Sequence, residues 1–182
     1  MEDGMVDGDA DLVAESLQGW LAAVAFADRD ADQVTELLTE AVLAWGTAQG
    51  WRVYRRAASV VKLPPPYEDR HSWVDVGIAR SGLPPVVVEI DQSERRRTLE
   101  KLTAEAAEGR VAVWLRWGAG PFTTPALPVR LATCQVSGRK DASGRRLFSA
   151  PVASRPAPSH SGADLGEADQ GDLFAAGGPG PA

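Results

Sequence analysis

Apolar residues in the first fifty positions return every three to four residues. They do so over residues 12–24 and again over residues 34–45, which predicts two amphipathic helices. Asp30, with Gln33 three residues later, is typical of a capping box at the start of the second helix, and Gly50 suits its end. The first helix is expected to cover either the core or the surface of a partner.

The period then changes from helical spacing to alternation. Alternating residues predict strands over residues 51–56, 72–80 and 85–91, with Pro64 to Pro66 interrupting the chain after the first. The turn at residues 81–84 favours a hairpin between the second and third strands. One face of the second strand is expected to carry Val74, Val76 and Ile78.

A third helix is predicted over residues 94–108, capped by Ser93, and a buried strand over residues 111–117. Residues 128–136 and 145–149 are expected to add a peripheral hairpin. The resulting order of helix, strand, strand, strand, helix, strand predicts an α/β (α+β) domain with a mixed central sheet.

Composition excludes several classes of protein. The chain has 182 residues, of which 44% are hydrophobic, and this is typical of one globular domain. Cys134 alone cannot form an internal disulfide, and with His71 and His160 it cannot complete a Cys/His zinc site. No run of apolar residues is long enough to cross a membrane and the first residues are acidic, so we expect a cytoplasmic protein.

The ends of the chain differ from its middle. Residues 149–182 are dominated by Ala, Pro, Gly and Ser and are predicted to be a disordered tail, and residues 1–9 a loose acidic end, leaving a single domain over residues 10–148. Residues 1–50 hold 11 acidic and one basic residue, whereas residues 51–117 hold 9 acidic and 12 basic residues. A basic middle suits a polyanionic partner, and it equally suits an ordinary solvated surface.

Three carboxylates are predicted to meet at the strand hairpin. Glu89 and Asp91 point to the same face at the end of their strand, and pairing would bring Asp75 beside them. Such acids repel unless a cation neutralises them, and hard oxygen ligands suit Mg²⁺ or Mn²⁺. In the alternative interpretation, Asp75 caps a turn and the other two acids are solvated.

The segment WVDVGIARSGLPPVVVEID, followed by a helix with LEKL and the strand VAVWLRW, resembles the core of the PD-(D/E)XK nuclease superfamily, which has the restriction-endonuclease-like fold. The resemblance covers roughly residues 32–117. Asp75 matches the first metal-binding Asp of that family and Glu89 matches the acid of its acid-x-Lys element. Asp91 departs from the pattern, because Lys is usual there.

The resemblance implies a divalent-metal-dependent DNA nuclease in which Asp75, Glu89 and Asp91 hold the metal and a water bound to it attacks a phosphodiester. Lys101, on the following helix, is the natural substitute for the missing Lys, and Glu40 resembles an additional acid of some members. Gln92, Ser93 and Arg97 are weaker substitutes for that Lys.

Three alternatives remain open at this stage. Lys101 could pair with Glu105, four residues further along the helix. The fold could be a catalytically inactive module that binds DNA or protein, since Asp91 replaces the usual Lys. The chain could also be an unrelated α/β interaction protein with solvated acids.

Basic and aromatic residues add candidates for DNA contacts. Arginine binds phosphates through two nitrogens, and the candidates are Arg52, Arg55, Arg56, Arg95, Arg96, Arg97 and Arg116. Trp20 and Trp45 fit core positions on helices, whereas Trp73 suits either base stacking or core packing.

The tail carries a short apolar motif. Gln170, Asp172, Leu173 and Phe174 resemble the pentapeptide through which bacterial DNA polymerases and repair proteins bind the sliding clamp. A short motif of this kind can place two apolar side chains in a groove of its partner. It implies recruitment to DNA repair or replication.

Overall fold

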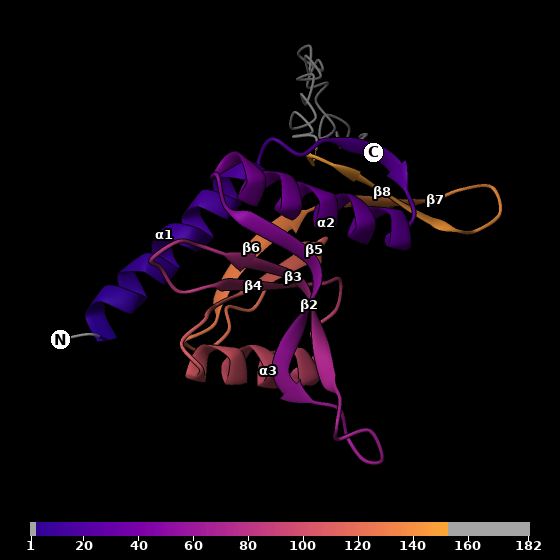
Figure 1. Cartoon of the computed structure of the whole chain (residues 1–182). Coiled ribbons are helices and arrows are strands. Elements are labelled where there is room, and N and C mark those ends of the chain that lie inside the picture. The colour runs from indigo at the N-terminus through magenta and orange to yellow at the C-terminus, as the bar shows by residue number, and fades with distance from the viewer. Residues whose placement is uncertain (1–2, 153–182) are drawn as a thin grey trace, which may run out of the picture.

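A mixed sheet of five strands runs through the centre of the protein in the computed structural model, which describes residues 3–152 (Figure 1). In spatial order the strands are β2 (Arg52–Lys62), β3 (His71–Ala79), β4 (Val86–Asp91), β5 (Val111–Gly118) and β6 (Arg130–Gln135). Neighbours are antiparallel from β2 to β4 and parallel from β4 to β6. The expected mixed α/β class is therefore confirmed.

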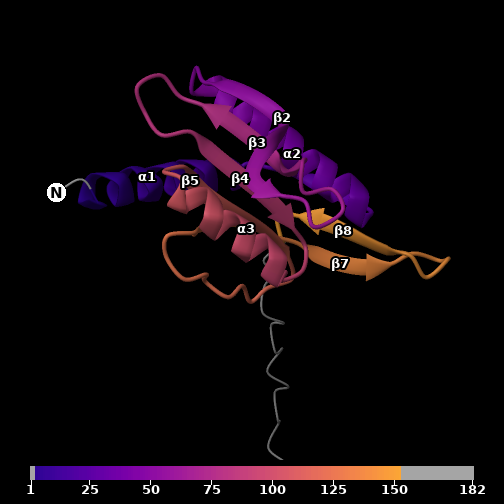
Figure 2. The ribbon, with the colours of Figure 1, turned by 60° about the horizontal axis from the view of Figure 1, so that its bottom comes forward.

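Helices cover both faces of this sheet (Figure 2). The helices α1 (Asp3–Leu21) and α2 (Ala31–Ala48) pack on one face, and α3 (Arg96–Ala107) packs on the other. The larger core lies under α1 and α2 and includes Leu17, Leu38 and Trp45, all fully buried. A smaller core lies between the sheet and α3, around Leu102 and Trp114.

The helix α2 begins as the sequence predicts. Asp30 accepts a hydrogen bond from the backbone N–H of Gln33, and the Gln33 side chain accepts one from the backbone N–H of Asp30. Near its other end, a Cβ at Gly46 would lie 2.6 Å from a methyl carbon of Val53. The absence of a side chain there lets α2 lie directly against β2 and β3.

The N-terminal helix starts earlier than expected and covers the core. Residues 1–9 are predicted to be loose, yet α1 begins at Asp3, and the Asp9 carboxylate lies 2.6 Å from the buried Arg80 guanidinium. Leu17 of this helix is fully buried, whereas Trp20, expected in the core, is 38% exposed. Of the two roles left open for this helix, the structure supports covering the core.

A second sheet corrects the expected peripheral hairpin. It contains β1 (Phe26–Arg29), β8 (Arg146–Ala150) and β7 (Ser137–Lys140), all antiparallel. The predicted partner of β8 was the segment that forms β6, but β6 extends the main sheet beside β5. An unpaired strand edge is a template for a further strand, and β6 occupies the edge that β5 would otherwise leave open.

The start of α3 also differs from the prediction. Arg95, rather than Ser93, occupies the N-cap position and makes no side-chain hydrogen bond to the helix. Gly109 follows the helix with a φ of +79° and ends it as expected. Within residues 3–152, no helix is both long and apolar enough to span a membrane.

Candidate active site

The candidate site forms where β3 separates from β4. Paired positions run from Ile78 with Val86 to Val76 with Val88 and stop there. Instead of a ladder bond, the Asp75 carboxylate accepts a hydrogen bond of 2.8 Å from the backbone N–H of Ile90. Asp75 is thereby held against β4 at the position where the strands diverge.

The divergence breaks the expected alternation along β3. Val74 packs in the smaller core beside α3, whereas Val76 packs in the larger core on the opposite face, so they do not share the face predicted for them. On β2, Arg56 lies between the residues paired with Val74 and Val76, and its φ is +55°. A positive φ at a residue with a Cβ is uncommon, and it marks a local twist of the hairpin beside Asp75.

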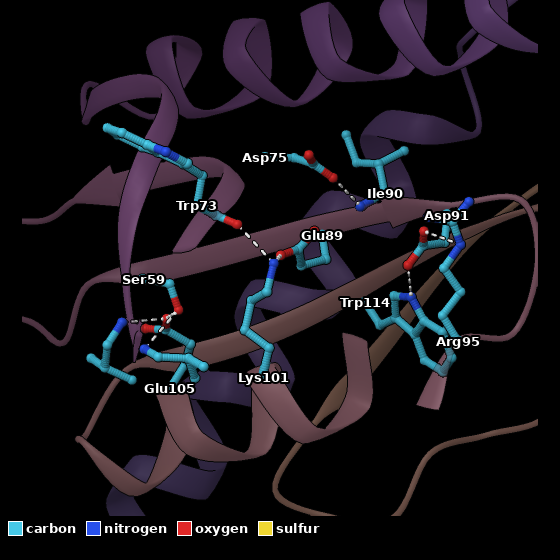
Figure 3. Close-up of polar contacts among 12 residues, drawn as sticks. Ser59, Trp73, Asp75, Glu89, Ile90, Asp91, Arg95, Lys101, Glu105 and Trp114 are labelled. Carbon is cyan, nitrogen blue, oxygen red and sulfur yellow. Dashed lines mark hydrogen bonds and ion pairs between the residues drawn. The ribbon is translucent and has the colours of Figure 1, made fainter. Parts of the chain in front are cut away.

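Glu89 and Lys101 meet at this divergence (Figure 3). The Lys101 ammonium lies 2.5 Å from a carboxylate oxygen of Glu89 and donates a hydrogen bond of 2.7 Å to the backbone carbonyl of Trp73. The Glu89 and Lys101 side chains are 8% and 16% exposed, respectively. The structure thus brings together Glu89 and Lys101, the acid and the lysine that the resemblance assigns to the site.

Burial raises the pKa of Glu89 from an ordinary 4.5 to about 7. Lys101 lowers this pKa by donating a hydrogen bond, and the nearby Asp75 carboxylate raises it again by repulsion. Burial and the second acid outweigh the ammonium ion. A further cation near a buried carboxyl group of this kind stabilises its ionised form.

Asp91 lies apart from the other two acids. One of its carboxylate oxygens accepts a hydrogen bond of 3.0 Å from the indole N–H of Trp114, and the other lies 3.5 Å from Arg95. Within residues 3–152, no three Asp, Glu, His or Cys side chains lie close enough together to hold a metal. The expected meeting of three carboxylates is therefore wrong, because Trp114 on the adjacent strand fixes Asp91.

The two remaining carboxylates still suit one divalent cation. Magnesium keeps several waters and is commonly bound through one or two carboxylates together with phosphate oxygens of a substrate. Asp75 and Glu89 supply this number of ligands, while Lys101 offers an adjacent positive charge. Glu89 and Asp91 are also 6% and 8% exposed, which contradicts the interpretation of solvated acids.

Two further carboxylates have other partners. Glu40 pairs with Arg55, which also forms an ion pair of 2.9 Å with Glu36. Glu105 is fully buried, accepts hydrogen bonds from the Ser59 hydroxyl and the Val60 N–H, and pairs with Arg110 at 2.7 Å. The alternative pairing of Lys101 with Glu105 is therefore wrong.

The arginines proposed for DNA contacts fall into two groups, those that pair with a carboxylate and those that do not pair within the described residues. Arg95 and Arg96 contact Asp91 and Glu100, and Arg55 is engaged by the acids of α2. Among residues 3–152, no carboxylate forms an ion pair with the exposed side chains of Arg52, Arg56 and Arg97, nor with the buried Arg116.

Trp73 is half exposed, so the core-packing interpretation is wrong. The Trp73 side chain is 51% exposed and the Arg56 guanidinium lies 5.7 Å from its ring centroid. Its backbone carbonyl, rather than its ring, contacts Lys101. Base stacking by Trp73 remains a prediction.

Sequence reasoning missed the structural roles of Trp114 and Glu105. The signal for Glu105 is its spacing, since Thr98, Leu102 and Glu105 are all buried along one face of α3. In the parallel register of β4 and β5, Trp114 is paired with Glu89 and Arg116 is paired with Asp91. Trp114 is therefore a diagonal neighbour of Asp91 across the two strands. This neighbour relation depends on strand pairing, which no local pattern reveals.

Comparison with protein-family models, with curated proteins and with solved structures finds no match to this chain. Residues 170–174 of the clamp-binding motif lie outside the described residues. The functional argument therefore depends on the geometry of Asp75, Glu89 and Lys101.

Proposed function

We propose that this protein is a divalent-metal-dependent DNA nuclease of the cytoplasm with a restriction-endonuclease-like core. The observation that carries the proposal is the buried contact of Lys101 with Glu89, beside Asp75, where β3 and β4 diverge. The element order from α2 to β5 and the parallel pairing of β4 and β5 agree with that core. The resemblance noted above assigns the same two acids to the metal.

Each residue of the site has a defined task in this proposal. Asp75 and Glu89 would hold Mg²⁺ or Mn²⁺, which lowers the pKa of water and stabilises charge on a phosphate. Lys101 places a positive charge beside Glu89, where it can stabilise the negative charge that develops on a phosphodiester. Ile90 N–H orients Asp75, and Trp73 carbonyl orients Lys101.

The test is cleavage of labelled single-stranded, duplex, flapped and mismatched DNA in Mg²⁺ or Mn²⁺. Asp75→Asn, Glu89→Gln and Lys101→Met should each lower the rate at least about a hundredfold, as removal of a charge-stabilising group does elsewhere. Glu108→Gln is the matched control, because Glu108 is exposed at the end of the same helix. Cleavage that survives the first three substitutions would contradict the proposal.

Metal binding is measured separately from cleavage. Thermal unfolding of the wild type should shift upward in Mn²⁺, since a cation bound only to the folded state stabilises it. The shift should disappear in the Asp75→Asn, Glu89→Gln double variant. In Lys101→Met it should persist although cleavage is lost, because Lys101 contributes no metal ligand.

A second candidate function follows from Asp91. Its contacts with Trp114 and Arg95 give it a structural role at the position where the resembled family carries Lys. This favours a catalytically inactive module that binds DNA or protein through the same fold. DNA binding without cleavage or a Mn²⁺-dependent shift would support that candidate over the nuclease.

A further inference from the structure

A cleft lies between the β2–β3 hairpin and α3, next to the candidate active site. Its volume is about 470 Å³. The lining comprises Val61, Lys62, Pro64 and Ser72 from the hairpin, and Arg97, Glu100 and Lys101 from the helix. Because Lys101 also contacts Glu89, the cleft and the candidate site share a side chain.

The charge of the cleft suits an anion. Lys62 and Arg97 are exposed, and neither forms an ion pair within the part of the chain that the structure describes. Glu100, the acid in the lining, is paired with Arg96 at 2.7 Å. The cleft therefore presents two free cations whose charge a phosphate could neutralise.

The lining of the cleft also includes apolar and uncharged residues. Val61 and Pro64 contribute an apolar surface, and Ser72 lies among them with only 6% of its surface exposed. Across residues 3–152, the Ser72 hydroxyl finds no hydrogen-bond partner. The Ser72 oxygen is also closed to solvent, which is unfavourable for a hydroxyl without a partner, so a bound group toward which this side chain turns would stabilise the site.

We propose that this cleft binds one unpaired nucleotide of a DNA strand, adjacent to the phosphate cleaved at the candidate active site. This inference rests on the proposed nuclease function. A nucleotide combines the required features: Lys62 and Arg97 bind its phosphate, Val61 and Pro64 contact the base, and the Ser72 hydroxyl turns toward the cleft to bond a polar edge of the base. A base inside a duplex must first leave its stack to enter, so the cleft selects unpaired DNA.

The proposal is tested by binding in EDTA, where no divalent metal supports cleavage. Fluorescence anisotropy of the full chain with a labelled single-stranded oligonucleotide and a blunt duplex of equal length gives the two dissociation constants. The single strand should bind about tenfold more tightly, comparable to one base contact. Lys62→Ala and Arg97→Ala should weaken that binding severalfold, and each should reduce the slope of log K against log salt by about 0.7.

Ser72→Ala tests the base contact, because it removes a hydroxyl that has no protein partner and should leave folding intact. It should weaken the single strand severalfold with little effect on the duplex. Lys140→Ala, on the exposed hairpin strand β7, is the control for loss of charge outside the cleft. Equal effects of the cleft variants on single strand and duplex would overturn the proposal.

A measurement on the wild type avoids any effect of substitution on folding. Titration of the isotopically labelled protein with deoxythymidine 5′-monophosphate should shift the backbone NMR signals of Val61, Ser72 and Lys101. Shifts confined to other surfaces would overturn the cleft assignment. Since neither experiment involves catalysis, binding at the cleft without cleavage in Mg²⁺ would contradict the nuclease proposal alone.

Discussion

Glu89 occupies an environment that penalises its own charge. Its carboxylate is buried beside Asp75, and burial with this second acid raises its pKa to about 7 despite the contact with Lys101. The sequence suggested repulsion between neighbouring acids and placed Asp91 among them, and it named Lys101 as a catalytic residue without predicting its contact with Glu89. Which side chain comes to rest beside Glu89 depends on α3 packing against the sheet.

The pKa of Glu89 predicts a specific dependence of stability on pH. Between pH 4.5 and about 7 the folded protein retains a proton that the unfolded chain has lost, so this group's contribution to the free energy of unfolding falls as pH rises. The pKa difference corresponds to about 3 kcal/mol. Glu89→Gln cannot titrate and should lack this component.

Urea unfolding of the wild type and Glu89→Gln at pH 5 and pH 8 measures the effect. The stability of the variant relative to the wild type should increase by up to about 3 kcal/mol between the two pH values. Other titrating groups are common to both proteins and cancel. A difference that is the same at both pH values would contradict the raised pKa.

At the scale of elements, Glu105 ties α3 to the edge strand β2. Its buried carboxylate accepts hydrogen bonds from Ser59 and from the Val60 N–H while pairing with Arg110. The helix that carries Lys101 is thereby bonded to the hairpin at two places, through Glu105 and through the Lys101 contact with the Trp73 carbonyl. The Glu105 carboxylate therefore has a structural role, since it bonds α3 to β2.

Removal of this carboxylate should destabilise the fold. Glu105→Ala leaves the Ser59 hydroxyl, the Val60 N–H and Arg110 without their acceptor, and loss of one partner in a buried ion pair costs about 3–5 kcal/mol. Urea unfolding gives the value, with the exposed Glu108→Ala expected within about 0.5 kcal/mol of the wild type. A loss below about 1 kcal/mol would show that the connection is weak.

At the scale of the whole molecule, function is proposed to combine the folded domain with the tail motif. Gln170, Asp172, Leu173 and Phe174 resemble a sliding-clamp-binding peptide, which would recruit a nuclease to DNA during repair or replication. This role is separable from the candidate active site, because the motif lies some eighty residues beyond β4 in the sequence.

The clamp prediction is tested by binding of the full chain to a purified bacterial sliding clamp. Leu173→Ala with Phe174→Ala should reduce affinity at least about tenfold, since such motifs bind through two apolar anchors. Leu165→Ala, outside the motif, should leave it unchanged. Undiminished binding by the double variant, or no binding by the wild type, would refute the prediction.

Local patterns were sufficient for most elements of the sheet and its helices. Asp30 and Gln33 correctly predicted the start of α2, because a capping box is formed within four residues. Alternating apolar residues likewise predicted β3 and β4, since side chains on a strand alternate between its faces. The partner strands of β6 and of β8 were not predictable in this way, because several strand edges compete for each of them.

The sequence by itself determined the mixed α/β class, the candidate acids Asp75 and Glu89, and Lys101 as the lysine to examine. Tertiary structure alone decided that Lys101 contacts Glu89, that Asp91 turns to Trp114, and that Ser72 lies in a cleft beside α3. The physical reason is range: periodicity and capping act over a few neighbouring residues, whereas burial and side-chain partners depend on how strands pair and helices pack.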